Sequence, residues 1–299
     1  MEDQVRLFLD DIFKRRRCSA NTVQAYRNDL TQLLNFVQVE KPYLTQWSRV
    51  DKPLLITFLS HLAKHDYTPA SISRKVAVIK TFFHFLLQHR LISDDPSAML
   101  PAPRVEKKMP QILSPEDIAR LLTCPARDNS PKALRDIAIL ELLYATGMRV
   151  TEMVSLDVAD VNLTDATVLC NKISPNRRVI PITPRAVETI KLYLQRGRPE
   201  IPPALNEDAL FLNPHGERLT RQGLWLIIKE CVKEAGIKTP VTPHTLRHSF
   251  AVQLLNRGED VARVQQLLGH VSAATTQGFV RLMEQSAAEA ERDAVVGEE

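Results

Sequence analysis

Basic and imidazole side chains gather in one short stretch of the C-terminal third, at a spacing that could bind an anion. His244 and Arg247 lie three residues apart, and Pro243 before them suits the first turn of a helix, where its missing N–H would be unpaired anyway. On a helix these two side chains lie side by side. His270 follows a second apolar run and the helix-ending Gly269. A guanidinium fork with imidazole donors favours a phosphate oxygen as the ligand.

The histidines have two other interpretations. His244 and His248 are four residues apart, a spacing that could bind zinc. A zinc hydrolase helix would carry Glu beside the first His, however, and Arg247 would repel a dication. We therefore expect neither a metal nor another cofactor. The second interpretation is that a single His or Arg here is a solvated or capping residue, since short motifs match by chance.

Residues 144–152 supply a second arginine. Arg149 comes just after Gly147, which ends an apolar helical run. Taken together, residues 144–152, 244–248 and 268–270 closely resemble the motif set of the tyrosine recombinase, or phage integrase, family.

The N-terminal third extends this resemblance. Residues 19–30 and 94–98 are similar to the Xer-type branch, so the likeness spans nearly the whole chain. It implies a site-specific recombinase that cleaves and rejoins DNA strands through a 3′-phosphotyrosyl intermediate. The implied partners are a double-stranded DNA recombination site and a homo- or hetero-tetramer with a related recombinase on two duplexes. A type IB-like DNA topoisomerase, which shares the chemistry, is the alternative enzyme.

The resemblance implies a role for each candidate catalytic residue. Arg149 and Arg247 would clamp the attacked phosphate, because arginine binds two oxygens at once and stays protonated while negative charge develops. His270 would add a donor, and His244 would accept the proton of the attacking phenol. Glu152 is interpreted either as a partner that orients an arginine or as a plain acid on a helix surface.

Lys172 matches the position of the family's catalytic lysine, which would protonate the leaving 5′ oxygen. The family usually has Gly next and another basic residue soon after, whereas Ile173 and Pro175 stand here. Arg177 and Arg178 are therefore competing candidates. An ordinary exposed hairpin lysine is the other interpretation of Lys172.

Phe279 stands where the family carries its nucleophilic tyrosine. A phenolate can attack phosphorus and leave again, but Phe has no hydroxyl. No tyrosine follows Tyr193 in the chain. We interpret Phe279 as an engineered Tyr→Phe replacement that stops cleavage while DNA is still bound. A naturally inactive DNA-binding relative is the alternative.

Residues 1–99 are predicted to form four helices, from apolar residues at helical spacing, with basic residues opposite the apolar stripes. The resemblance implies that this region is a SAM-like core-binding domain that grips DNA. Residues 100–113, with three prolines and three basic residues, are predicted to be an extended linker. The candidate DNA contacts are Arg27, Arg74 and Lys75 in this domain, with Arg221 and Gln222 at the start of a later helix, where Arg can read guanine and Gln adenine.

Residues 114–299 are predicted to form a mostly helical catalytic domain with a small antiparallel sheet, so the fold class is mainly α. β-branched residues around a Pro-Asn turn predict a hairpin between 167–172 and 177–182. Later helices are predicted over residues 184–196, 220–235, 243–257, 260–268 and 272–292. The resemblance implies that the last of these docks into a neighbouring protomer.

Composition and charge narrow the class of protein. The net charge is +4, and the last twenty residues hold six acidic against two basic residues, so the rest of the chain is more basic than the total shows. Four well-separated cysteines, without a Cys-x-x-Cys pair, argue against a zinc ribbon or a secreted disulfide framework. Neither a signal peptide nor a membrane-spanning run is recognisable, so we expect a cytoplasmic protein.

Overall fold

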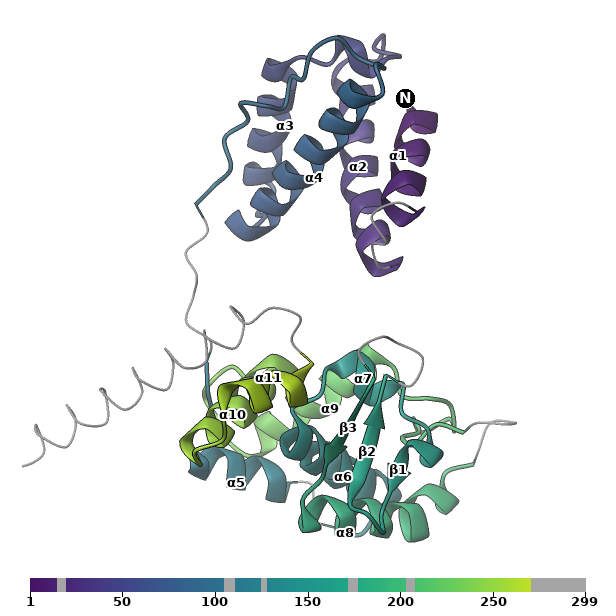
Figure 1. Ribbon diagram of the computed structural model, residues 1–299, viewed down its shortest axis with the longest axis vertical. Coiled ribbons are helices and arrows are strands. Elements are labelled where there is room, and N and C mark those ends of the chain that lie inside the picture. The colour runs from purple at the N-terminus through teal and green to yellow at the C-terminus, as the bar shows by residue number, and fades with distance from the viewer. Residues whose placement is uncertain (15–19, 105–110, 125–127, 172–176, 203–207, 270–299) are drawn as a thin grey trace, which may run out of the picture. The chain divides into compact units, whose positions relative to one another are not determined.

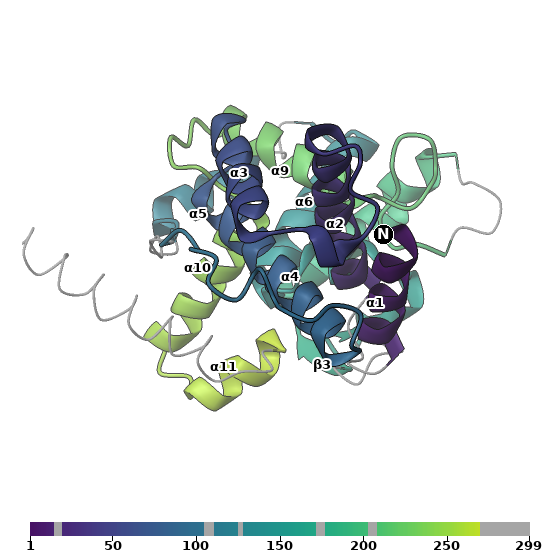
Figure 2. The same cartoon turned by 90° about the horizontal axis from the view of Figure 1, so that it is seen from above.

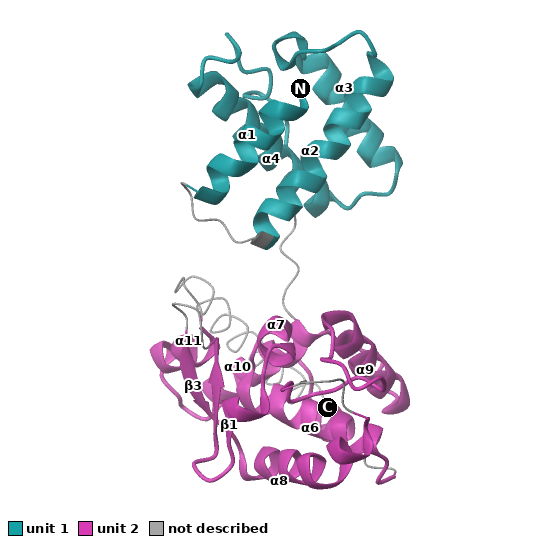
Figure 3. Ribbon diagram, turned by 90° about the vertical axis from the view of Figure 1, so that its right-hand side faces the viewer, with its two compact units in different colours: residues 1–108 teal, residues 109–299 magenta. Residues whose placement is uncertain are grey.

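The computed structural model describes residues 1–14, 20–104, 111–124, 128–171, 177–202 and 208–269. The chain divides into two compact units, residues 1–108 and residues 109–299 (Figure 3). Each unit has its own buried apolar cluster.

The described part of the N-terminal unit is a helical bundle. Its elements are α1 (Glu2–Lys14), α2 (Ala20–Glu40), a 3₁₀ turn η1 (Trp47–Arg49), α3 (Lys52–Lys64) and α4 (Pro69–Gln88) (Figure 1). Asp51 and Thr68 cap α3 and α4, because each side chain accepts a hydrogen bond from the backbone N–H three residues on. Phe82 packs edge-to-face against Phe8 and Trp47, with ring centroids 5.4 Å and 5.0 Å apart. The four predicted helices are confirmed.

The C-terminal unit is mostly helical. Its α-helices are α5 (Pro115–Thr123), α6 (Pro131–Thr146), α7 (Val150–Val154), α8 (Pro184–Leu192), α9 (Arg221–Glu234), α10 (Pro243–Asn256) and α11 (Val261–Leu268), and the short turns are η3 (Val158–Asp160), η4 (Tyr193–Gly197) and η5 (Arg198–Glu200). α6 is buried on nearly all sides and packs against α8 and α10, while α11 lies beside α10 (Figure 2). The helix predicted over 184–196 is confirmed in its extent, but only its first part is α-helical, since α8 ends at Leu192 and continues as the π-helical turn η4.

A small sheet covers one side of this unit. It contains β1 (Val161–Asn162), β2 (Thr167–Cys170) and β3 (Arg178–Pro181), all antiparallel, in the order β1-β2-β3. In the centre of the sheet Val168 is paired with Val161 on one side and Ile180 on the other. The predicted hairpin is confirmed, but the sequence reasoning missed β1, which at two residues is too short to show an alternating pattern.

Candidate active site

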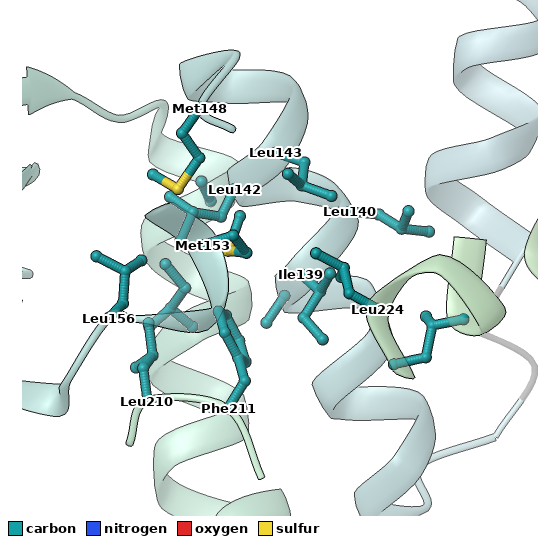
Figure 4. Close-up of a cluster of buried hydrophobic side chains, with 14 of the residues drawn as sticks. Ile139, Leu140, Leu142, Leu143, Met148, Met153, Leu156, Leu210, Phe211 and Leu224 are labelled. Carbon is teal, nitrogen blue, oxygen red and sulfur yellow. The ribbon is translucent and has the colours of Figure 1, made fainter. Parts of the chain in front are cut away.

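Arg149 lies at the start of α7, directly after the end of α6. Gly147 ends α6 in the left-handed conformation, with φ 57°, and Arg149 is the N-cap residue of the next helix. The short connection is anchored in the core by Met148 and Met153, both buried among α6 side chains (Figure 4). The side chain of Arg149 remains 39% exposed. The fold thus anchors the backbone of this arginine through its buried neighbours and leaves its guanidinium group accessible.

Arg247 comes from α10, nearly one hundred residues later. Thr242 caps this helix, and Pro243 occupies its first turn, the position predicted for this proline from the sequence. The Arg247 side chain is buried, and its Nη1 donates to the carbonyl of Gly147 at 2.6 Å, so α10 is tied to the end of α6. Burial, followed by the nearby charge of Arg149, lowers the pKa of Arg247 to about 10.

Three guanidinium groups converge on the end of α11. The carbonyl oxygens of residues 267–269 accept, in that order, from Arg178 Nε at 2.7 Å, Arg247 Nη2 at 2.6 Å and Arg149 Nη2 at 2.9 Å. The last carbonyl groups of a helix have no intrahelical partners, so they are natural acceptors for these donors. Arg149 and Arg247, which the family resemblance places at one phosphate, do lie together and are bonded to adjacent peptide groups.

Glu152 is the acid at the centre of this cluster. It is buried and accepts hydrogen bonds from the Arg149 backbone at 2.7 Å and from Asn171 Nδ2 at 2.8 Å. Arg178 pairs with it through two bonds of 2.9 Å. Burial raises the pKa of Glu152, but the hydrogen bonds from Arg178 and from the Arg149 backbone outweigh it and bring the pKa to about 2. Of the two interpretations of Glu152, the structure supports the one in which it orients an arginine.

The competing proton donors have different surroundings. Arg177 is exposed, whereas the side chain of Arg178 is only 9% exposed and is engaged with Glu152 and a carbonyl group. Of the two competing arginines, Arg178 is thus the largely buried one, with its guanidinium group already bonded. Lys172 lies outside the described residues.

The histidines fall into two groups. His244 is exposed on the first turn of α10, on the same helix as Arg247, and its ring centroid is 6.3 Å from that of His248. Burial, followed by the charges of His244 and Arg247, lowers the pKa of His248. His270 and Phe279, like the helix predicted over 272–292, lie outside the described residues. Among the side chains that the structure describes, no group of three His, Cys, Asp or Glu could hold a metal ion.

The predicted exposure of one candidate DNA contact is wrong. Lys75 was expected on an exposed face, but it is buried and its Nζ donates to Asp29 at 2.7 Å and to Gln32 at 2.6 Å. Helical spacing puts Lys75 at the edge of the apolar stripe, where its ammonium group pairs with the buried Asp29 on α2. Arg27 is exposed, and Arg74 is half exposed and also bonded to Asp29.

The candidates on α9 are placed as expected. Arg221 and Gln222 are exposed on its first turn, beside Trp225, which is 42% exposed. Lys229 lies over the ring of Trp225, 5.0 Å from the centroid. This helix therefore presents a basic and aromatic face to solvent.

A groove of about 680 Å³ runs beside the arginine cluster, between β3 and α11. Its lining includes Arg177, Arg178, Arg263, Gln266 and Gly269. The groove is rich in basic and amide side chains and shares Arg178 and Gly269 with the cluster, so an extended anion could approach the site along it.

Two sets of contacts in the cluster, those of Arg178 and of Asn171, could not be predicted from the sequence. The contacts of Arg178 cross from β3 to α7 and α11, which no local pattern reveals. Asn171 adopts φ 56° and donates to Glu152, and only the known tolerance of Asn for this conformation could have drawn attention to it. Arg178 was a candidate from the sequence in another role, as a proton donor, and its bonds to α7 and α11 depend on the folded chain.

Gly147 offers a test of the close packing around this site. Its φ is 57°, and a Cβ atom there would lie 2.3 Å from Phe250 Cδ1 and 2.9 Å from Leu268 Cδ2. We expect Gly147→Ala to lower the free energy of unfolding by about 2–3 kcal/mol, from backbone strain and overlap together. Gly236→Ala is the matched control, since its φ is 66° but nothing lies within 4 Å. Chemical denaturation that shows equal losses for the two variants would contradict the packing argument.

Comparison with known proteins places the chain. Residues 111–286 match the Phage integrase family, and residues 5–90 match the Phage integrase, N-terminal SAM-like domain. The chain belongs to the phage integrase family of tyrosine recombinases. This integrase-family chain is 40% identical over 291 residues to Tyrosine recombinase XerC of Roseiflexus sp. (strain RS-1), covering 97% of the chain and 92% of the relative. It is 38% identical over 283 residues to Tyrosine recombinase XerD of Listeria monocytogenes serovar 1/2a, covering 94% and 95%.

Solved structures agree with this assignment. The integrase-family chain superposes on the XerH site-specific recombinase, bound to palindromic difH substrate in a post-cleavage complex, with a TM-score of 0.74 at 21% identity, covering all of this chain and 90% of that one. It superposes on the XerA recombinase with a TM-score of 0.55 at 26% identity, covering 98% of both chains. The family and the fold class predicted from the sequence are confirmed. None of the helices in the described ranges is both long and apolar enough to span a membrane.

Proposed function

We propose that this chain binds a double-stranded DNA recombination site and holds the scissile phosphate between Arg149 and Arg247. The observation that carries the proposal is the convergence of both guanidinium groups on neighbouring carbonyl oxygens at the end of α11. Two such groups from distant parts of the chain, one accessible and one buried, form a clamp that suits two oxygens of one phosphate.

The remaining candidates complete the chemistry of strand cleavage. In a chain with tyrosine at position 279, the phenolic oxygen would form a bond to phosphorus while the bond from phosphorus to the 5′ oxygen breaks. His244 would take the phenolic proton, Lys172 would give a proton to the leaving oxygen, and His270 would donate to the phosphate. Phe279 has no oxygen, so the chain as written would bind and would not cleave.

The rest of the molecule would position the duplex. The helical region 1–99 would act as the core-binding domain, with Arg27 and Arg74 on its exposed surface, and residues 114–299 as the catalytic domain. Arg221 and Gln222 would read the major groove from α9. The proposed assembly is a homo- or hetero-tetramer on two duplexes. The XerH comparison, whose structure contains its DNA substrate, supports DNA as the partner.

Restoring the nucleophile tests this proposal. The Phe279 chain would first select its preferred duplexes from a random-sequence pool, and nicked suicide substrates would then be made from them. We expect Phe279→Tyr protein to form a denaturant-resistant protein–DNA adduct and the Phe279 chain, as the matched control, to form none. The 3′-phosphotyrosyl link would be located by mass spectrometry of the digested adduct.

The other outcomes discriminate between the alternatives. Specific binding by both proteins without an adduct would identify a naturally inactive DNA-binding relative. Relaxation of plasmids that lack any selected site would indicate a topoisomerase. Binding that does not weaken as salt rises would exclude DNA as the partner, because phosphate contacts release counterions.

A further inference from the structure

Arg178 connects three elements of the candidate site. It lies on β3, pairs with Glu152 of α7 through both terminal nitrogens at 2.9 Å, and donates from Nε to the carbonyl of Leu267 at the end of α11 at 2.7 Å. All of these contacts are made by one planar group, which fixes the distance between α7 and α11.

We propose that Arg178 is a positioning residue for the phosphate clamp, which sets the separation of Arg149 and Arg247 without touching DNA. The inference rests on the proposed function, because it assigns to Arg178 the placement of the two arginines that would bind the phosphate. Through Glu152 it fixes the start of α7, where Arg149 is the N-cap residue. Through Leu267 it fixes the peptide groups to which both clamp arginines are bonded.

Close packing supports a fixed position for this guanidinium group. Gly269 ends α11 with φ 63°, and a Cβ atom there would lie 2.9 Å from Arg178 Nη1 and 3.1 Å from its Cζ. The backbone of the α11 end therefore lies directly against the guanidinium plane. A shift of Arg178 would be transmitted to the carbonyl groups that hold Arg149 and Arg247.

Lysine cannot take over this role. Arginine offers five N–H donors in a rigid plane, which reach the two Glu152 oxygens and a carbonyl group at once. An ammonium group is a compact point charge that would satisfy the carboxylate and release the end of α11. Arg178→Lys keeps the positive charge and removes only the planar group. It is therefore a sharper test than a substitution that removes the charge as well.

The test compares Arg178→Met and Arg178→Lys in the Phe279→Tyr protein, in single-turnover cleavage of the selected suicide substrate. We expect the rate at saturating DNA to fall about 10²-fold for Arg178→Met, by analogy with small misplacements of catalytic groups, and DNA affinity to change less than about threefold. Arg178→Lys should recover only a small part of the rate. Arg185→Met is the matched control, because Arg185 on α8 also pairs with a largely buried acid, Glu141, but lies outside the clamp.

The pH dependence of the cleavage rate distinguishes a positioning role of Arg178 from a general loss of structure in the variant. Among the described residues, the charged and titratable groups around Glu152 include Arg149 on α7, Arg178 on β3, Arg247 on α10 and Cys170 on β2. With Arg178 present, Glu152 stays ionised at all working pH values, since its pKa is about 2. Without Arg178, its hydrogen bonds and charge no longer offset the effect of burial on Glu152. The pKa of Glu152 therefore rises, and the acid takes up a proton as pH falls.

Arg178→Met should therefore lose cleavage rate more steeply than the Phe279→Tyr parent as pH falls. Adding Glu152→Gln should abolish this additional loss. A rate equal to that of the parent, or an additional loss that persists in the double variant, would overturn the proposal.

A readout without cleavage keeps the inference testable if Phe279→Tyr forms no adduct. In the Phe279 chain, ¹⁵N-arginine spectra report the Nε–H signals of Arg149 and Arg247, assigned from single Arg→Lys variants. We expect both signals to shift or broaden in Arg178→Met and to stay in place in Arg185→Met. Unchanged signals would refute a positioning role, whatever the fate of the proposed function.

Discussion

Arg247→Lys, in the Phe279→Tyr protein, is expected to lower the rate of adduct formation by about 10²–10³-fold at saturating DNA. This is the loss seen when one preorganised donor to a developing oxyanion is removed. Lysine cannot reach the carbonyl groups of Gly147 and Leu268 together and still face a phosphate, because its donors sit on a single nitrogen. The rate would be measured by quenched single-turnover assays on the selected substrate, with thermal unfolding followed in parallel.

The control is Arg257→Lys, at the opposite end of the same helix. Arg257 caps the C-terminus of α10 and is exposed, so its replacement should leave the rate within about twofold. DNA affinity should change little in either variant, since one contact among many phosphate contacts is altered. A cleavage rate for Arg247→Lys close to that of the parent would remove the arginine clamp from the proposed mechanism.

Asp29→Asn is expected to lower the free energy of unfolding of the N-terminal unit by about 3–5 kcal/mol. Asp29 on α2 is buried and accepts from Lys75 Nζ at 2.7 Å, and Lys75 is itself buried. Removing the charge of one partner leaves the other buried without compensation, which is the costly case for such pairs. In a Trp225→Phe background, Trp47 is the single tryptophan, so its fluorescence during urea titration reports the N-terminal unit alone.

Two further variants test whether the buried pair of Asp29 and Lys75 is the cause of the expected loss of stability. Arg74→Met removes a half-exposed partner of the same carboxylate and should cost less than about 1 kcal/mol. Asp29→Leu combined with Lys75→Met replaces the whole pair and should recover most of the stability lost in Asp29→Asn. If Arg74→Met proves as damaging as Asp29→Asn, the burial of Lys75 is not the reason for the loss.

Local signals predicted much of the fold. Pro243, Gly147 and Gly269 indicated correctly where α10 starts and where α6 and α11 stop, because helix termini depend on residues close in sequence. The same signals put Arg149 at the start of a helix. The prediction that Arg149 lies close to Arg247 followed from the family resemblance, not from residue spacing.

The remaining features depend on contacts between distant elements. Lys75 lies at the edge of an apolar stripe, and only the presence of Asp29 on another helix decides that it is buried. Arg178 looked like one of two equivalent hairpin arginines, yet it alone meets the acid of α7. The pairing of side chains across elements is a property of the folded core, so neither outcome could be derived from periodicity.

The way the clamp is held has an energetic consequence. Peptide carbonyls orient Arg247 without cancelling its charge, while the one carboxylate in the described cluster is shared with Arg178 and Arg149. The described cluster therefore carries more positive than negative charge in a partly buried position. This excess charge lowers the stability of the folded protein. Binding of the proposed anionic phosphate would relieve that repulsion. We therefore expect ligand binding to raise the thermal stability of the protein.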